Sequence, residues 1–154
     1  MSLDIYIISP EPIKKKSTGI FARIDGATRE LTREEALKMF PKAEPWQITE
    51  EEIETNEFWH GNITHNLNEM AGQCWGDVYP LDDLLWRDEM PDDIIEYVTN
   101  LFACLFELED NPKKYRRYNP ENGWGTYEQL VEFVRSFIHA LVDMPPGSTI
   151  EYSR

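Results

Sequence analysis

Hydrophobic and polar residues alternate at the start of the chain, a period of two that is typical of a β-strand with one buried face. The alternation covers residues 3–8 and is expected to end at residues 9–12, Ser-Pro-Glu-Pro, because proline cannot donate a hydrogen bond to a sheet. Residues 19–24 and 28–31 also have the composition of strands, and the dipeptide Asp25-Gly26 between them favours a hairpin turn.

The last residues of the chain, 149–153, again have the composition of a strand. The segment Pro-Pro-Gly at 145–147 separates them from the helical pattern that comes before. An isolated strand leaves its backbone N–H and C=O groups unmatched, so we expect the two terminal strands to pair with each other.

A period of three to four residues predicts helices in much of the remaining chain. Thr32 and Glu35 have the form of a capping box, which would open a short helix that ends at Phe40. Asn62 is expected to cap a central helix, because its side chain can accept from a backbone N–H of the first turn. The buried stripe of that helix would consist of Ile63, Leu67, Met70 and Ala71.

Two longer helices are expected to form most of the core. Pro91 fits the first position of one helix, with Asp92 and Asp93 in its first turn. The apolar stripe of this helix would consist of Ile94, Ile95, Val98, Leu101, Phe102, Leu105 and Phe106. Thr126 and Gln129 form a second capping box, and the helix that follows is apolar on nearly every side.

The fold class that follows is α+β, with a small sheet that contains the N- and C-terminal strands packed on four or five helices. A chain of 154 residues, 41% hydrophobic and 12% aromatic, is long enough for one sizeable core, so a single domain over residues 1–154 is expected. The start of the chain lacks the features of a signal peptide, no apolar run reaches membrane-spanning length, and two cysteines are too few for a disulfide framework. These features favour a cytoplasmic protein that does not bind membranes.

The formal net charge of −14 is concentrated in the middle of the chain. Residues 43–111 contain eighteen acidic side chains against Arg87 alone, whereas residues 1–42 and 112–154 are slightly basic. Such a field repels phosphates, so a nucleic-acid partner is disfavoured. It would attract a basic protein or mimic DNA, and it is equally explained as a solvated acidic surface.

Three charged runs are expected in exposed segments. The lysines at 14–16 are expected in a solvated loop, and the acidic run at 50–54 in a loop or a turn of helix. The basic and aromatic residues at 113–118 are expected to form a short helix that pairs with the acidic middle of the chain.

The most informative stretch for function is residues 62–67, Asn-Ile-Thr-His-Asn-Leu. Thr64, His65 and Asn66 would lie off the buried stripe within the first turn of the central helix, where backbone N–H groups suit an anion or a carbonyl. Trp59 is held close to them by the chain. The alternative is that Asn62 is only a cap, Thr64 bonds to the backbone and His65 lies on the surface.

A second informative stretch is residues 119–127. Glycines on both sides of Trp124 allow unusual backbone angles that would fix the indole. We expect Asn119, Asn122, Trp124 and Tyr127 to share one pocket with the first stretch, with amides and an imidazole as polar groups and aromatic rings as walls.

At these two stretches the chain resembles a family of small, functionally uncharacterised proteins encoded by bacteriophages and prophages. The shared features are the Met-Ser-Leu-Asp-Ile-Tyr start, residues 62–67 followed by Met-Ala at 70–71, Leu-Trp-Arg at 85–87, Asn-Pro-x-Asn-Gly-Trp-Gly-x-Tyr at 119–127 and the Ser-Arg end. The resemblance covers residues 1–8 and 58–154, and it implies that residues 10–57 are an insertion relative to shorter members. It implies a bacterial host and brings no established activity.

These observations favour a non-enzymatic binding protein for a nucleotide-like or peptide ligand, without a cofactor or metal. One alternative is an acidic interaction module or DNA mimic that antagonises a basic host factor. The other is a His-dependent enzyme with His65 as general base or as a metal ligand beside His60, Cys74 or Asp77. The two histidines are five residues apart, unlike the i, i+4 pair of a zinc-binding helix.

Overall fold

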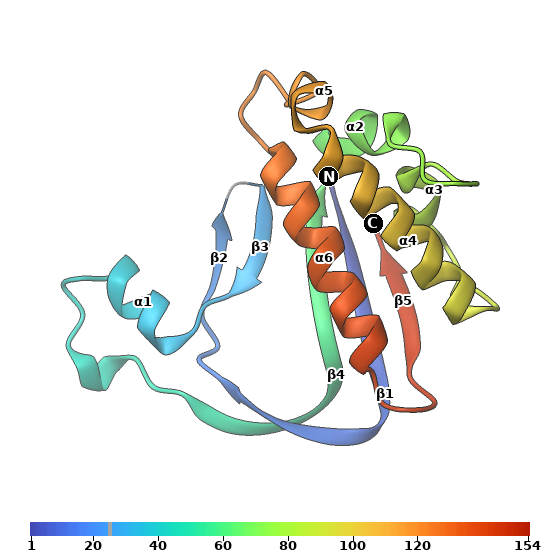
Figure 1. The fold of residues 1–154 in the computed structure, drawn as a ribbon. Helices are drawn as coiled ribbons and strands as arrows, with labels where there is room; N and C mark the ends of the chain where they lie inside the picture. Colours follow the sequence, from blue (N-terminus) through green and yellow to red (C-terminus); the bar gives the residue numbers. More distant parts are fainter. Residues whose placement is uncertain (25) are drawn as a thin grey trace.

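The computed structural model describes residues 1–24 and 26–154, and its centre is a three-stranded antiparallel sheet (Figure 1). β1 (Ser2–Ser17) lies between β4 (Glu51–Thr64) and β5 (Thr149–Ser153), in the order β4-β1-β5. The two terminal strands pair as expected, with Ile7 opposite Ile150. Leu3, Ile5 and Ile7 are fully buried on one face of β1, in agreement with the alternating pattern.

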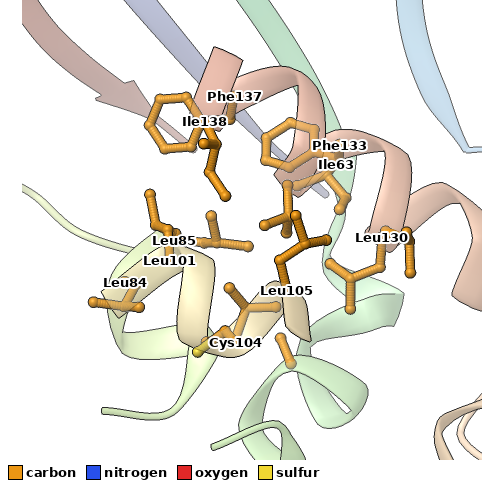
Figure 2. Close-up of a cluster of buried hydrophobic side chains, with 14 of the residues drawn as sticks. Ile63, Leu84, Leu85, Leu101, Cys104, Leu105, Leu130, Phe133, Phe137 and Ile138 are labelled. Atoms are coloured by element: carbon orange, nitrogen blue, oxygen red, sulfur yellow. The ribbon is translucent and has the colours of Figure 1, made fainter. Parts of the chain in front are cut away.

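Two long helices, α4 (Ile94–Asp110) and α6 (Tyr127–Asp143), cover the apolar face of this sheet (Figure 1). Figure 2 shows Leu101 and Leu105 of α4 on the side of the helix that faces Phe133 and Phe137 of α6. The shorter helices α2 (Asn68–Gln73), α3 (Leu81–Leu85) and α5 (Pro112–Arg116) extend the same core at one end of the sheet. The predicted α+β fold is confirmed.

A second, smaller group of elements stands beside the sheet (Figure 1). The hairpin of β2 (Phe21–Ile24) and β3 (Ala27–Glu30) is followed by α1 (Arg33–Met39) and a single 3-10 turn, Pro45–Gln47. We call residues 18–24 and 26–50 the hairpin lobe and the rest of the described chain the body. The lobe has its own cluster of buried residues, Leu31, Ala36 and Ile48.

Both predicted capping boxes are present. Thr32 caps α1 with Glu35 as its partner, and Thr126 caps α6 with Gln129. The predicted strands of the hairpin are also present, and Gly26 has the positive φ of 85° that a tight turn requires. The other residue of the predicted turn, Asp25, lies outside the described residues.

The predicted start of the central helix was wrong. Asn62 and Ile63 belong to β4, and Thr64 caps a 3-10 turn, His65–Leu67, that continues into α2. The helical spacing from Ile63 to Ala71 therefore spans the end of a strand and the start of a helix. Ile63 is buried because it lies on the inner face of β4 opposite Leu3.

The predicted end of the first strand was also wrong. β1 continues through residues 9–12, and the prolines are tolerated because the ladder with β4 is irregular between Ile8 and Ile13. The lysine run and the acidic run that we expected in loops form paired strand segments, residues 13–17 of β1 and 51–55 of β4, which we call the ribbon. Opposite charges across the strands, such as Lys14 near Glu52 at 3.8 Å, favour this pairing.

The start and the outer surface of α4 also differ from the expectation. The helix is capped by Asp93, which accepts from the Glu96 N–H at 3.0 Å, so Pro91 precedes the helix. Its buried side carries Tyr97, Leu101, Cys104, Leu105 and Leu108. Ile95, Phe102 and Phe106 of the expected buried stripe face outward instead.

Candidate functional site

The two stretches that the sequence singled out lie side by side. Asn66 donates from Nδ2 to the carbonyl oxygen of Trp124 at 3.2 Å. Gly125, with a φ of 114°, packs so closely that a Cβ atom there would lie 2.9 Å from side-chain atoms of Thr64 and Leu67. Only glycine fits both the backbone angle and the contact, which explains its place after Trp124.

Most polar groups of these stretches bind neighbouring backbone. Asn119 accepts from the Tyr127 N–H at 2.8 Å, and Asn122 accepts from the Trp124 N–H at 2.9 Å. The Tyr127 hydroxyl donates to the carbonyl of Leu108 at 2.6 Å. These hydrogen bonds fix the loop that leads into α6, so the groups that make them have a structural role.

His65 is half-buried beside Trp86. Its ring lies 5.8 Å from the ring of Trp86, at an interplanar angle of 58°. Its Nδ1 atom is buried and has no hydrogen-bond partner among the described residues. The imidazole therefore packs against the body, and it does not line the cleft between the hairpin and β4.

Asn62 joins the body to the hairpin lobe. Its Oδ1 accepts from the Thr28 N–H of β3 at 2.8 Å, and its Nδ2 donates to Asp4 at 2.9 Å. Asp4 also lies 2.7 Å from Nε2 of His60, and the ring of His60 stacks on Tyr6 with a centroid distance of 4.5 Å. Burial, followed by the nearby charge of Asp4, raises the pKa of Tyr6.

The tip of the hairpin is held at two further points. Gln129 donates from Nε2 to the carbonyl of Ile24 at 3.2 Å, and the guanidinium of Arg23 lies 5.4 Å from the centroid of the Trp124 ring. Together with the bond between Thr28 and Asn62, we call these the tip contacts. The two sequence motifs thus share a structural task, because both position the hairpin beside β4.

Beside the tip contacts, the hairpin and the sheet enclose a cleft of about 400 Å³, and Thr28, Asn62 and Gln129 belong both to these contacts and to its lining. It is lined by residues 27–29 of β3, residues 59–64 of β4, and one face of α6. Successive residues of a strand point to opposite faces, so a cavity lined by six consecutive residues runs along the edge of β4. β4 is the outer strand of its sheet, and β3 pairs with β2 on its other side. The cleft therefore lies between two strand edges that face each other.

The floor of the cleft is apolar and firmly packed. The indole of Trp59 stacks on Phe137 at 5.2 Å and meets the edge of Phe133 at 5.9 Å. Its Nε1 donates to Ser136 Oγ at 3.1 Å. A Cβ atom at Gly61 would overlap the same indole, so glycine is required there. The ring is a fixed wall that stacks on Phe137.

The charged groups at the rim are engaged in ion pairs. Arg29 bonds to Glu35 of α1, and this bond is the first cause that lowers the pKa of Glu35 to about 2. Glu132 of α6 lies 3.1 Å from Arg135. Among the lining residues that the structure describes, Arg29 and Glu132 are thus paired charges, and Arg29 is not a free cation.

Of the nine residues that the sequence singled out, three line the cleft: Trp59, Asn62 and Thr64. Six do not, and these are His65, Asn66, Asn119, Asn122, Trp124 and Tyr127. Sequence reasoning missed Thr28, Arg29 and Phe133 as lining residues. Only the pairing of strands reveals an unpaired edge, so no single stretch of sequence carried that signal.

The groups considered for an enzyme lie in separate places. His60 faces Asp4 on the open face of the sheet, whereas Cys74 is buried beside Cys104. The adjacent Cys104 side chain, followed by burial, raises the pKa of Cys74, which disfavours a thiolate there. Among residues 1–24 and 26–154, no group of three or more His, Cys, Asp or Glu side chains is placed to hold a metal ion.

In the same described residues, each helix is too short or too polar to cross a membrane. Comparison of the chain with protein-family models, curated proteins and solved structures finds no significant match. Any function must therefore be argued from the cleft and the surface themselves.

Proposed function

We propose that the protein is a binding protein that takes up a short extended peptide in the cleft, along the unpaired edge of β4. The observation that carries the proposal is the position of the cleft between the edges of β3 and β4. Strand edges present backbone N–H and C=O groups in a regular row, which is a template for another strand. A bound peptide would be a new strand between the lobe and the body, and it would replace the hydrogen bond from Thr28 to Asn62 that now joins the two edges.

The dimensions support a peptide of a few residues. A strand advances about 3.3 Å per residue, so residues 59–64 of β4 offer an edge that a segment of four or five residues can follow. In strand addition, backbone hydrogen bonds supply affinity and pockets for alternate side chains supply selectivity. The floor formed by Trp59 and Phe133 suits one apolar side chain of the peptide.

A nucleotide is the weaker of the two ligands that the sequence suggested. Phosphate groups require free cations, and the Arg29 side chain at the rim is bound to Glu35. A base requires an open aromatic face, and the Trp59 ring already stacks on Phe137. The net charge of −14 further opposes an anionic ligand.

The resemblance to phage and prophage proteins supports a host or phage protein as the source of such a peptide. A protein of this kind would capture an exposed strand or a chain terminus of a host or phage protein. The proposal does not require a catalytic step or a cofactor.

The test uses a small panel of blocked five-residue peptides that alternate apolar and polar residues, added to the full chain. Binding along β4 should shift the backbone amide NMR signals of residues 59–63 and 27–29. A matched peptide with N-methylated backbone amides lacks the donors for strand pairing and should bind at least about tenfold more weakly, a loss of about 1.4 kcal/mol.

Two variants of exposed glutamates on α6 complete the test. Glu132→Trp places a large side chain in the lining of the cleft and should abolish binding. Glu128→Trp makes the same change one turn earlier, outside the lining, and should leave binding intact. The proposal fails if the N-methylated peptides bind equally well or if both variants behave alike.

A further inference from the structure

The outward side of α4 is an apolar surface that the peptide cleft does not explain. Ile95, Phe102 and Phe106 are 82%, 39% and 60% exposed. The two phenylalanine rings stack on each other at 6.2 Å, and Thr99 lies between them and Ile95 on the same side of the helix. We call these four residues the α4 outer face. Its spacing of i, i+4, i+7 and i+11 makes a continuous stripe about three turns long.

The stripe is wider than a single row of side chains. Gly76 packs directly against Ala103 and Cys104, which places the loop of residues 74–80 along the flank of α4. That loop carries three more exposed apolar side chains, Trp75, Val78 and Tyr79. Apolar residues gathered in this way on a surface mark a site of interaction more often than single exposed residues do.

The surroundings of the α4 outer face are acidic. α4 contains no lysine, arginine or histidine. Beside its first turn lies a second cavity of about 450 Å³, whose lining has four acidic residues, Asp83, Asp92, Asp93 and Glu96, against one cation, Arg87. The cavity also reaches Tyr79 and Asn100, so it borders both the loop and the helix. An apolar stripe next to an acidic cavity is complementary to a partner that has apolar and basic groups side by side.

We infer that the α4 outer face docks a basic amphipathic helix of a protein partner. The stripe from Ile95 to Phe106 is about 17 Å long at a rise of about 1.5 Å per residue, which matches three turns of a partner helix. Apolar side chains of the partner would pack on Phe102 and Phe106, and a flanking lysine or arginine would enter the acidic cavity. A second copy of this chain is the poorer occupant, because it would bring the same acidic residues into contact with each other.

This surface is independent of the peptide cleft. The cleft lies between the hairpin lobe, β4 and α6, whereas the α4 outer face is on the side of α4 turned away from α6. Figure 2 shows the opposite, buried side of α4, where Leu101 and Leu105 meet α6. Either proposal can therefore fail without the other.

The test measures binding of a designed helical peptide of about 18 residues to the full chain at physiological salt, by fluorescence anisotropy. The probe has leucines along one face and lysines and arginines on both flanks. One control peptide has glutamates in place of its basic residues. A second has the same composition in an order that disperses the leucines around the helix. We expect both controls to bind at least about tenfold more weakly than the probe.

Variants of the protein locate the site. Phe102→Ser combined with Phe106→Ser should weaken binding of the probe at least about tenfold, because exposed rings at an interface centre carry much of its energy. Asp92→Asn combined with Glu96→Gln should weaken it severalfold and reduce its salt dependence. Val142→Ser removes an equally exposed apolar side chain from α6 and should change nothing.

Three results would overturn the inference. The first is evidence that charge alone attracts the probe. Equal binding of the probe and the dispersed control would give this evidence, and so would unchanged binding by the double phenylalanine variant. The second is the absence of binding by the probe. The third is a concentration-dependent dimer in sedimentation that the double phenylalanine variant converts to a monomer, which would assign the α4 outer face to a second copy.

Discussion

The body and the hairpin lobe are held together by very different means. The body has one continuous core in which residues from β1, β4, β5 and five helices are buried. The lobe has a cluster of three fully buried side chains, Leu31, Ala36 and Ile48, with a few partly buried neighbours. A segment that buries so little apolar surface cannot offset the entropy of ordering its chain by itself. The lobe therefore depends on the ribbon and the tip contacts.

The difference bears directly on the peptide cleft. One wall, formed by β4 and α6, belongs to the rigid body, and the other, formed by β3, belongs to the weakly stabilised lobe. Regions of low local stability open without global unfolding. A bound strand would bridge both walls, so we expect it to stabilise the lobe more than the body.

The largest effect should come from the core of the body. Phe137→Ala removes a fully buried ring that stacks on Trp59, and it should destabilise the whole protein by about 3–5 kcal/mol. Thermal unfolding followed by circular dichroism measures this loss. Phe106→Ala is the matched control, because that ring is exposed and its loss should cost less than about 0.5 kcal/mol. Similar melting temperatures for both variants would contradict the assignment of Phe137 to the stabilising core.

A core substitution in the lobe should act locally. Leu31→Ala removes a buried side chain and should cost the lobe about 2–3 kcal/mol. Amide hydrogen exchange should then accelerate in β2, β3 and α1 while the amides of α4 and α6 keep their protection. Met39→Ala, at an exposed position of the same lobe, should leave both regions unchanged. If Leu31→Ala lowers protection throughout the body, the two regions unfold as one unit and the comparison is wrong.

An intermediate effect is expected at the tip contacts. Asn62→Ala leaves the Thr28 N–H without its partner and removes one of the two contacts of Asp4, at a cost of about 1–3 kcal/mol. The exchange rate of the Thr28 amide should rise about tenfold or more. Asn122→Ala also removes an amide that accepts from a backbone N–H, in an exposed turn, and should affect only the neighbouring Trp124 amide. An unchanged exchange rate of the Thr28 amide in the Asn62 variant would show that this tip contact does not stabilise the lobe.

The smallest effect concerns acid. The pKa of Glu35 is held at about 2, below its unfolded value of about 4.3, chiefly by its bond to Arg29. The pair therefore stabilises the lobe above about pH 4.3 and loses this contribution as the pH falls toward 2. Because the pair is partly exposed, the contribution should stay below about 1 kcal/mol.

Hydrogen exchange of the lobe between pH 5 and pH 2.5, corrected for intrinsic rates, measures this contribution. Glu35→Gln keeps an acceptor for the cap of α1 but should flatten the pH dependence. Glu34→Gln, which alters only an exposed pair with Lys38, should not. An identical pH dependence in both variants would show that the bond to Arg29 has no role in the stability of the lobe.

Local signals in the sequence predicted the elements that depend on neighbouring residues. The capping boxes at Thr32 and Thr126 were confirmed because cap and partner are three residues apart, within one turn. The pairing of the terminal strands was also confirmed. It followed from the rule that strands do not remain alone, and from the closing strand at residues 149–153.

The errors arose where distant residues decide the structure. The lysines of β1 form a strand because the acidic residues of β4 lie opposite them, and neither run is strand-like by itself. The pattern from Ile63 to Ala71 fits a helix, yet the first residues of this segment belong to β4 because they pair with β1. Phe102 and Phe106 face outward because another side of α4 packs against α6. Apolar residues cover more of the α4 surface than α6 can bury, so the sequence alone does not indicate which of them face α6.

The candidate site was predicted in part for the same reason. The polar residues at 62–66 and 119–127 do meet, as Asn66 and Trp124 show, but most are used to hold backbone. The cleft is created by the hairpin lobe, from a segment to which we assigned no function in the sequence. Its relation to β4 depends on Thr28 reaching Asn62 across 34 residues of chain.

The ribbon has one more consequence. Ser17 and Glu51 are direct partners across it, so the chain leaves and re-enters the β1–β4 ladder at the same rung. A two-residue turn could therefore join these strands in place of the intervening segment without shifting their register. The lobe is therefore an insertion that can be deleted. A chain without it would keep the body and expose the edge of β4 along its full length.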